Sequence, residues 1–168
     1  MRIPRILVRS GFEGRGSGDS FQLSEDRAHY LTKVLRLAVD APLYVFDGKG
    51  LEYHARIEEC GKKHCLIELG ELRDGADGQS PLRTHLGIAL SKGDRFDWVL
   101  QKATELGVSV ITPLLTERVE LRLKGERAEK KINHWQGVVE SACEQSGRRC
   151  LPTLHQPLPL NDWLQQDN

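Results

Sequence analysis

The stretch THLGIALSKGDRFDWVLQKATELGVSVITPLL, residues 84–115, decides the fold of the second half of the chain. Residues 84–90 form a continuous apolar run, which is typical of a strand covered on both faces. Residues 93–107 then repeat apolar side chains at helical spacing and stop at Gly107, a natural helix end. Residues 108–115 form a second apolar run. This order predicts a βαβ unit with parallel strands and a right-handed crossover. The apolar positions of the helix are Phe96, Val99, Leu100, Ala103 and Leu106.

The residues that follow predict a second long helix over 126–146, which ends at Gly147. Residues 151–160 predict a loop with room for a short strand, and Asn161 is the expected N-cap of a last helix. Two or three parallel strands leave sheet edges and faces uncovered. We therefore expect residues 82–168 to be an incomplete α/β domain. One face of the long helix is apolar, at Ala128, Ile132, Trp135, Val139 and Ala142.

Residues 1–72 have a different, mostly β pattern and predict a small β-barrel domain. In residues 51–60, Leu51, Tyr53, Ala55 and Ile57 alternate with polar side chains, as in a half-buried strand. A helix is expected over 24–37, with Ser24 as its N-cap. Residues 73–81 are polar and turn-rich, and predict a linker between two domains. The other expected strands lie at 21–24, 41–50 and 63–72.

Bulk composition excludes several classes of protein. Lys plus Arg and Asp plus Glu both number 24, so a nucleic-acid partner would have to be bound by local patches. No apolar run approaches the roughly 20 residues of a membrane span, and we expect a cytoplasmic protein. The four cysteines include no CxxC pair, which favours ordinary reduced thiols over a metal site.

Polar side chains with two interpretations lie on both predicted helices of the second domain. Gln101, Lys102 and Glu105 share one face with Trp98, and form either a solvated surface or part of a site. Arg148 follows the second helix, where it could complement the helix dipole or bind a phosphate. Glu144 and Gln145 lie beside it in sequence.

A basic stripe in the first domain also has two interpretations. His29, Lys33 and Arg36 recur at helical spacing, and Arg2 and Arg5 could extend the stripe. Such a stripe is either an ordinary solvated face or a surface that binds an RNA backbone.

Several of these motifs together resemble one family, the ribosomal RNA small subunit methyltransferase E family. That family methylates N3 of a uridine in 16S ribosomal RNA. The resemblance covers nearly the whole chain, and its order of QKxxELG, TER and EQxGR is specific. The matching segments are MRIPRI (1–6), HYLTKVLR (29–36), FDG (46–48), SKGDRFDWVLQKATELGVSVITPLLTER (91–118) and SACEQSGR (141–148).

The resemblance implies an α+β protein of two domains: an N-terminal PUA-like β-barrel that binds RNA, then an α/β SPOUT domain with a trefoil knot. That domain binds S-adenosylmethionine and forms a homodimer. The resemblance also places His29 and Arg36 on the RNA-facing part of the barrel, and Arg118 and Arg148 are our candidates for phosphate contacts. The residues implied at or near the active crevice are Lys92, Gln101, Lys102, Glu105, Arg118, Glu144, Gln145 and Arg148.

The chain departs from the family pattern in one respect. Members of the family carry a GPEGG-type loop and an ETA segment that hold the methyl donor, and neither occurs in this sequence. We therefore expect no donor site and no activity in these 168 residues alone. The competing hypotheses are a non-catalytic RNA-binding module and an α/β nucleotide-binding protein unrelated to RNA, although the sequence contains no phosphate loop.

Overall fold

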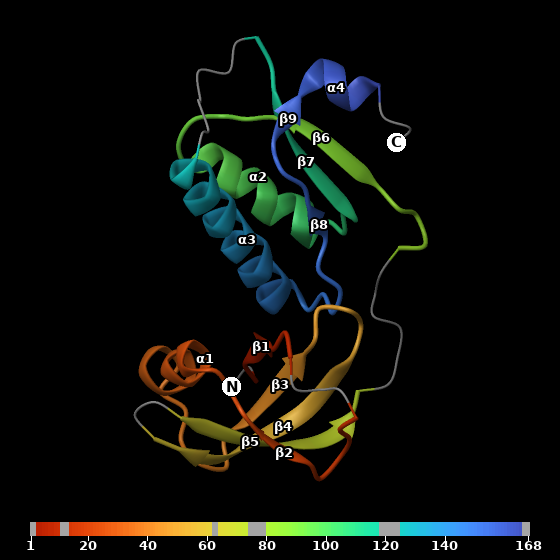
Figure 1. The fold of residues 1–168 in the computed structure, drawn as a ribbon. Coiled ribbons are helices and arrows are strands. Elements are labelled where there is room, and N and C mark those ends of the chain that lie inside the picture. Colours follow the sequence, from red (N-terminus) through yellow and green to blue (C-terminus); the bar gives the residue numbers. More distant parts are fainter. Residues whose placement is uncertain (1–2, 11–13, 62–63, 74–79, 118–124, 166–168) are drawn as a thin grey trace. The chain divides into compact units, whose positions relative to one another are not determined.

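The computed structural model describes residues 3–10, 14–61, 64–73, 80–117 and 125–165. The chain divides into two compact units, Met1–Asp77 and Gly78–Asn168 (Figure 1). Each unit has its own apolar core, so the two-domain α+β prediction is confirmed. The expected linker, 73–81, lies mostly outside the described residues.

The first unit is built on a five-stranded sheet in the order β1-β3-β4-β5-β2. β1 pairs with β3 in parallel, whereas the β3–β4, β4–β5 and β2–β5 pairs are antiparallel. Side chains from one face of this sheet form the core, together with Ala28 and Leu31 from the helical segment. The strands are β1 (Arg5–Leu7), β2 (Ser20–Gln22), β3 (Pro42–Phe46), β4 (Glu52–Cys60) and β5 (Cys65–Leu72).

The expected alternation along β4 is confirmed over most of the strand and wrong at its start. Tyr53, Ala55 and Ile57 are buried. At the start, however, Leu51 is 43% exposed and Glu52 has no exposed surface. The reason is electrostatic: the Glu52 carboxylate accepts hydrogen bonds from two arginines, so the polar side chain has partners inside the protein.

The helix expected over 24–37 is shorter and changes its pitch. Helix α1 spans Glu25–His29 and continues as a π-helix, η1, over Tyr30–Val34. Ser24 is the N-cap residue, although its side chain makes no capping hydrogen bond. Beyond η1, Arg36 has a left-handed backbone with φ of 54°. The regular face that was predicted to carry His29, Lys33 and Arg36 therefore does not form.

The second unit contains a parallel sheet in the order β6-β7-β8, and β9 also pairs with β7. All three pairs with β7 are parallel, which confirms the predicted strand–helix–strand unit. Helices α2 and α3 lie side by side on one face of the sheet (Figure 1). The elements are β6 (His85–Ala89), α2 (Asp94–Glu105), β7 (Val110–Leu115), α3 (Glu126–Ser146), β8 (Thr153–Leu154), β9 (Leu158–Pro159) and α4 (Leu160–Leu164).

The core of this unit lies between the two long helices and the sheet. Phe96 of α2 packs against Trp135 of α3 with ring centroids 4.7 Å apart, and Leu100 and Val139 complete the contact. The prediction for Leu106 is wrong, because its side chain is 87% exposed. Helix α2 ends at Glu105, so Leu106 is already the C-cap residue and leaves the apolar face.

Strand β6 is less buried than its apolar sequence predicts. Its first four residues are only partly buried and Ala89 is exposed, since β6 forms an edge of the sheet and pairs with β7 alone within the described chain. By contrast, β7 is central, and Ile111, Thr112 and Leu114 are all buried. The prediction of a strand covered on both faces is therefore wrong for β6, whereas the second apolar run is buried in β7 as expected.

The ends of the last helices show one confirmed and one wrong prediction. Gly147 follows α3 with φ of 87°, the left-handed conformation expected of a helix-terminating glycine. Asn161 is not the N-cap of α4, because the helix already begins at Leu160, after Pro159. No helix in the described part of the chain is long and apolar enough to cross a membrane.

Candidate functional site

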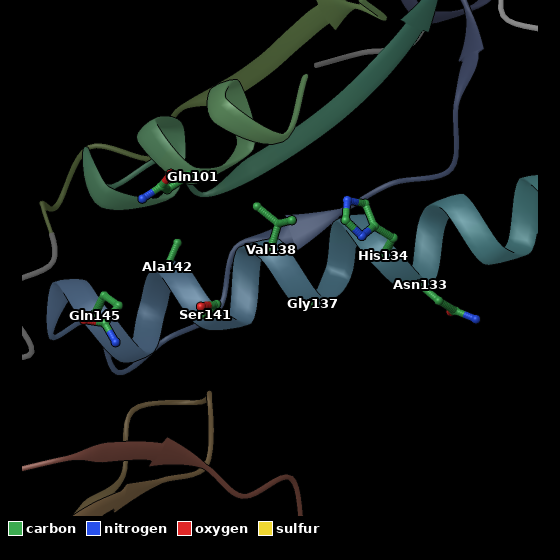
Figure 2. Close-up of a pocket in the computed structure, with 8 residues that line it drawn as sticks. All are labelled: Gln101, Asn133, His134, Gly137, Val138, Ser141, Ala142 and Gln145. Atoms are coloured by element: carbon green, nitrogen blue, oxygen red, sulfur yellow. The ribbon is translucent and has the colours of Figure 1, made fainter. Parts of the chain in front are cut away.

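A pocket of about 470 Å³ lies between α2 and α3 in the second unit (Figure 2). Gln101 reaches it from α2, and all other lining residues come from α3. The side chains of Val138 and Ala142 point toward α2 (Figure 2). The pocket thus has an apolar floor, and polar groups lie around it. The lining residues are Gln101, Asn133, His134, Gly137, Val138, Ser141, Ala142 and Gln145.

The spacing along α3 explains why the pocket exists. Asn133, Gly137, Ser141 and Gln145 recur every four residues, so they share one face of the helix. Gly137 has no side chain, and a Cβ added there would meet no atom within 4 Å. The glycine therefore leaves open space in the middle of the polar row.

The polar stripe of α2 forms a hydrogen-bonded network next to this pocket. Gln101 Nε2 donates to Glu105 Oε1 at 2.9 Å, and Lys102 Nζ donates to Glu105 Oε2 at 2.8 Å. The hydrogen bond from Lys102, followed by that from Gln101, lowers the pKa of Glu105 below its ordinary value. Glu105 is therefore a carboxylate that holds two neighbours in place, and it is poorly suited to accept a proton near neutral pH.

Arg148 connects the end of α3 to the end of α2. Its Nη1 donates to the carbonyl oxygens of Thr104 at 3.1 Å and Val108 at 2.7 Å. Carbonyl groups at a helix C-terminus lack hydrogen-bond donors within the helix. This guanidinium therefore supplies a donor at the C-terminal end of α2. Glu144, one turn earlier on α3, is buried, whereas its neighbour Gln145 faces the pocket. A phosphate contact by Arg148 stays a prediction.

His134 lines the pocket and was not among the predicted site residues. Its Nε2 lies 2.5 Å from Asp97 Oδ2 of α2, and Lys131 Nζ lies 3.9 Å from Asp97 Oδ1. Among the lining residues, His134 thus links α3 to a carboxylate of α2. The sequence signal for the pocket is the four-residue repeat of small and polar residues on α3, and His134 lies next to its first member, Asn133.

The remaining predicted site residues do not gather at this pocket. Lys92 precedes α2, whereas Lys102 and Glu105 lie near its other end, about 15–20 Å away along a helix of this length. His29 and Lys33 are exposed in the first unit, as is Arg36. Arg2 and Arg118 lie outside the described residues. Contact with RNA stays a prediction for Arg2, His29, Lys33, Arg36, Lys92 and Arg118, as does a place in the active crevice for Lys102 and Glu105.

Arg5 requires a correction. Its side chain is 7% exposed, donates to Glu52 and stacks with its guanidinium carbon 4.6 Å from the centre of the Phe46 ring. A side chain held in this way stabilises the first unit and is not presented to a solvent-side RNA backbone. The basic stripe expected of this unit therefore loses one member.

A second pocket lies at the carboxyl ends of β7 and β9, the usual place for ligands in parallel α/β sheets. Its volume is about 330 Å³, near the lower end of the range for small-molecule sites. Among the described residues it is lined by Leu115, Thr116, Glu117, Pro159, Leu160 and Asn161. No group of three or more His, Cys, Asp or Glu in the described part of the chain is placed to hold a metal ion.

Comparison with known proteins gives matches to both units. A family model described as an RNA methyltransferase domain matches residues 78–168, and one described as an RNA methyltransferase PUA domain matches residues 23–70. A ribosomal RNA small subunit methyltransferase E from Buchnera aphidicola is 30% identical over 99% of this chain. The match covers 64% of that relative, so the chain spans slightly less than two thirds of its length.

Two solved structures have the same fold over the whole chain. A ribosomal RNA small subunit methyltransferase E from Neisseria gonorrhoeae, bound to S-adenosylmethionine, superposes with a TM-score of 0.91 at 35% identity. The match covers 99% of this chain and 67% of that one. A protein from Legionella pneumophila in complex with the same cofactor gives a TM-score of 0.93 at 34% identity, covering 100% of this chain and 68% of that one. With both units matched in sequence and in structure, the chain belongs to the RNA methyltransferase family that includes ribosomal RNA small subunit methyltransferase E.

Proposed function

We propose that the protein takes part in the S-adenosylmethionine-dependent methylation of uracil N3 in 16S ribosomal RNA of the small ribosomal subunit. The observation that carries the proposal is the match of two RNA methyltransferase models, one to each unit. The two relatives that contain S-adenosylmethionine support the identity of the methyl donor.

In this proposal the described residues form at most part of the donor site. The pocket at the carboxyl ends of β7 and β9 is small and is lined by two short segments, 115–117 and 159–161. No described residue is therefore assigned to the methyl donor in this proposal. Calorimetric titration of S-adenosylmethionine into the 168-residue chain tests this assignment, and we expect no heat of binding.

The pocket between α2 and α3 is the proposed contact for the RNA. Gln101, Asn133 and Gln145 each offer both hydrogen-bond donors and an acceptor, as the edge of a nucleobase does. The apolar floor at Val138 and Ala142 suits the face of a flat ring. Glu105 contributes indirectly, because it fixes Gln101 through a hydrogen bond to its amide.

Methylation at N3 requires that the nitrogen lose its proton as the methyl group approaches. A residue that accepts this proton must lie within hydrogen-bond reach of the base. In the described structure, Glu105 is held as an anion by two donors, which makes it a positioning residue in this proposal. Gln101 therefore orients the base in this proposal, and Glu105 holds Gln101 in place.

RNA binding by the chain gives the first test of the proposed contact. The double variant Gln101→Ala and Gln145→Ala should bind a 16S ribosomal RNA fragment about tenfold more weakly, because two hydrogen-bonding amides are lost. Gln136→Ala is the matched control, since Gln136 belongs to α3 and does not line the pocket. If the double variant and the control bound the RNA with equal affinity, the proposed contact between this pocket and the RNA would be refuted.

Methyl transfer tests the reaction itself. The 168-residue chain and the product of the complete open reading frame that encodes it are each incubated with unmethylated small subunits and labelled donor. Nucleoside mass spectrometry should find N3-methyluridine in the second sample. A methyl group on a different base atom, or on another RNA, would refute the proposed specificity. RNA binding with no transfer by either sample would favour a non-catalytic RNA-binding module.

A further inference from the structure

Two cysteines face each other at the end of the β4–β5 hairpin. Cys60 is the last residue of β4, Cys65 is the first residue of β5, and the two are partners in the antiparallel register. The Gly61 N–H donates to the His64 carbonyl oxygen at 2.8 Å, so the pair next to the turn is hydrogen-bonded. Pairs alternate in an antiparallel ladder, which makes Cys60 and Cys65 the close, non-hydrogen-bonded kind.

This position meets the geometric requirement for a disulfide. Non-hydrogen-bonded partners have Cα atoms about 4.5 Å apart, at the short end of the range of about 4.4–6.8 Å that a disulfide bridges. The two Sγ atoms are already in contact at 2.7 Å, and both cysteines are free thiols. A bond between them would therefore need little movement of the backbone.

The two thiols differ in their surroundings. Cys65 is fully buried, and burial together with the neighbouring Cys60 raises its pKa to about 12. Cys60 is partly exposed at the end of its strand. A thiolate is the form of cysteine that reacts with oxidants, and an oxidant arrives from solvent. Cys60 is therefore placed to react first, and Cys65 to react second from inside the protein.

We propose that Cys60 and Cys65 are a reversible oxidation site, in which hydrogen peroxide converts the two thiols into a disulfide that crosslinks the β4–β5 hairpin. In the first step the Cys60 thiolate attacks a peroxide oxygen, so that an S–O bond forms and the O–O bond breaks. The departing hydroxide is protonated to water, and Cys60 becomes a sulfenic acid.

In the second step the Cys65 sulfur attacks the Cys60 sulfur. The S–S bond forms, the S–O bond breaks, and the hydroxyl leaves as water with the proton of the Cys65 thiol. The cysteines together lose two electrons, and hydrogen peroxide is reduced to two molecules of water. A thiol reductant reverses the change by exchange.

The experiment uses the full chain with Cys143→Ser and Cys150→Ser, which leaves only the two hairpin cysteines. Hydrogen peroxide is the oxidant, and circular dichroism confirms the fold before and after treatment. We expect loss of both titratable thiols, a mass decrease of about 2 Da and full reversal by dithiothreitol.

The sequence provides a clear peptide test. Trypsin cuts after Lys62 and Lys63, which separates Cys60 in peptide 57–62 from Cys65 in peptide 64–73. Only a disulfide keeps these peptides together. Persistence of both thiols in the folded chain would refute the proposal. So would disulfides between chains, or a bond that forms as fast in denaturant as in the native protein.

Single variants test the order of the two steps. With Cys65→Ser, oxidation should stop at a Cys60 sulfenic acid, seen as a gain of about 16 Da and trapped by dimedone. With Cys60→Ser, oxidation of Cys65 should be at least about tenfold slower, since Cys65 is buried with a raised pKa. Equal rates in the two variants would contradict the assigned roles.

Discussion

The stability of the first unit depends on one residue, Glu52. It has no exposed surface, and accepts hydrogen bonds from Arg5 Nε at 2.7 Å and from Arg73 Nη1 at 2.9 Å. We expect Glu52→Ala to lower the free energy of unfolding by about 3–5 kcal/mol, because removing it deprives the buried Arg5 of its counter-charge. Urea denaturation of the whole chain measures the change.

The control for this prediction is Asp40→Asn, which removes the charge and keeps a side chain that tolerates the left-handed backbone of this residue (φ of 65°). Asp40 pairs with Arg56 at 3.1 Å, but the two side chains are 76% and 52% exposed. An exposed ion pair contributes about 1 kcal/mol or less. If the Glu52 and Asp40 variants lost the same stability, the buried position of Glu52 would have no special role.

His85 is the residue from which we expect a pH dependence. Its Nε2 lies 2.7 Å from Thr112 Oγ1, and burial followed by the nearby His155 lowers the pKa of His85 below its ordinary value of 6.5. The unfolded chain therefore binds a proton at a higher pH than the folded chain does. The free energy of unfolding should fall as the pH falls through about 6.5.

Denaturation by urea between pH 5.5 and pH 8 measures this dependence. His85→Asn removes the titrating group and should flatten the curve in the region around pH 6.5. The other five histidines remain in this variant, so their contribution stays in the baseline. A curve of unchanged slope would mean that His85 is not the group responsible.

At the scale of elements, two glycines should respond to alanine in opposite ways. A Cβ at Gly87 of β6 would lie 2.7 Å from Trp163 Cζ2, so Gly87→Ala should displace the ring and loosen α4. Faster hydrogen exchange of the α4 amides would show this loosening. Unchanged exchange would mean that the ring moves aside without cost.

Gly137→Ala is the opposite case. Gly137 lies inside α3 with no atom within 4 Å of an added Cβ, and alanine is the better helix former. We expect a gain of about 0.5–1 kcal/mol in the free energy of unfolding, together with a narrower pocket between α2 and α3. A loss of stability by thermal unfolding would contradict the open space seen at this position.

The elements that the sequence predicted best are those whose signals are local. Helix α3 begins and ends where its apolar face and Gly147 indicate, and β6 and β7 pair in parallel as their connection by one helix requires. The errors arise from contacts that are distant in sequence. Leu51 and Glu52 exchange their expected environments because Arg5 and Arg73 lie beside the strand in the fold.

The candidate site could be predicted only in part for the same reason. Gln101 and Gln145 were both chosen from the sequence and line one pocket. Asn133 and His134 were missed, since only the packing of α3 against α2 brings them to it. The π-helix at Tyr30–Val34 was also missed, because apolar spacing is too coarse to separate it from an α-helix.

At the scale of the whole molecule, exposed apolar surface should govern association. Leu106 is 87% exposed and Trp98 is 62% exposed, and both line a groove beside the edge strand β6. We expect the chain to self-associate with rising concentration, because such a surface is costly in water. Leu106→Lys should reduce the association without loss of stability, since a cation is favourable at the end of α2.

Sedimentation velocity over a concentration series measures this effect. Leu164→Lys is a matched control, because Leu164 is 64% exposed on another element, α4, and does not line the groove. If both variants reduced the association equally, general surface polarity would explain it. If neither did, the groove beside β6 would not be the surface involved.

The contact between His85 and Trp163 gives the protein an optical property of its own. The two rings meet edge to face with centroids 5.6 Å apart. A charged imidazolium withdraws electron density from an excited indole and quenches its emission, whereas a neutral imidazole does so far less. Trp163 emission should therefore dim when His85 gains a proton. Because the chain has two other tryptophans, the difference in emission between the native chain and Trp163→Phe reports the ionisation state of His85 without any added label.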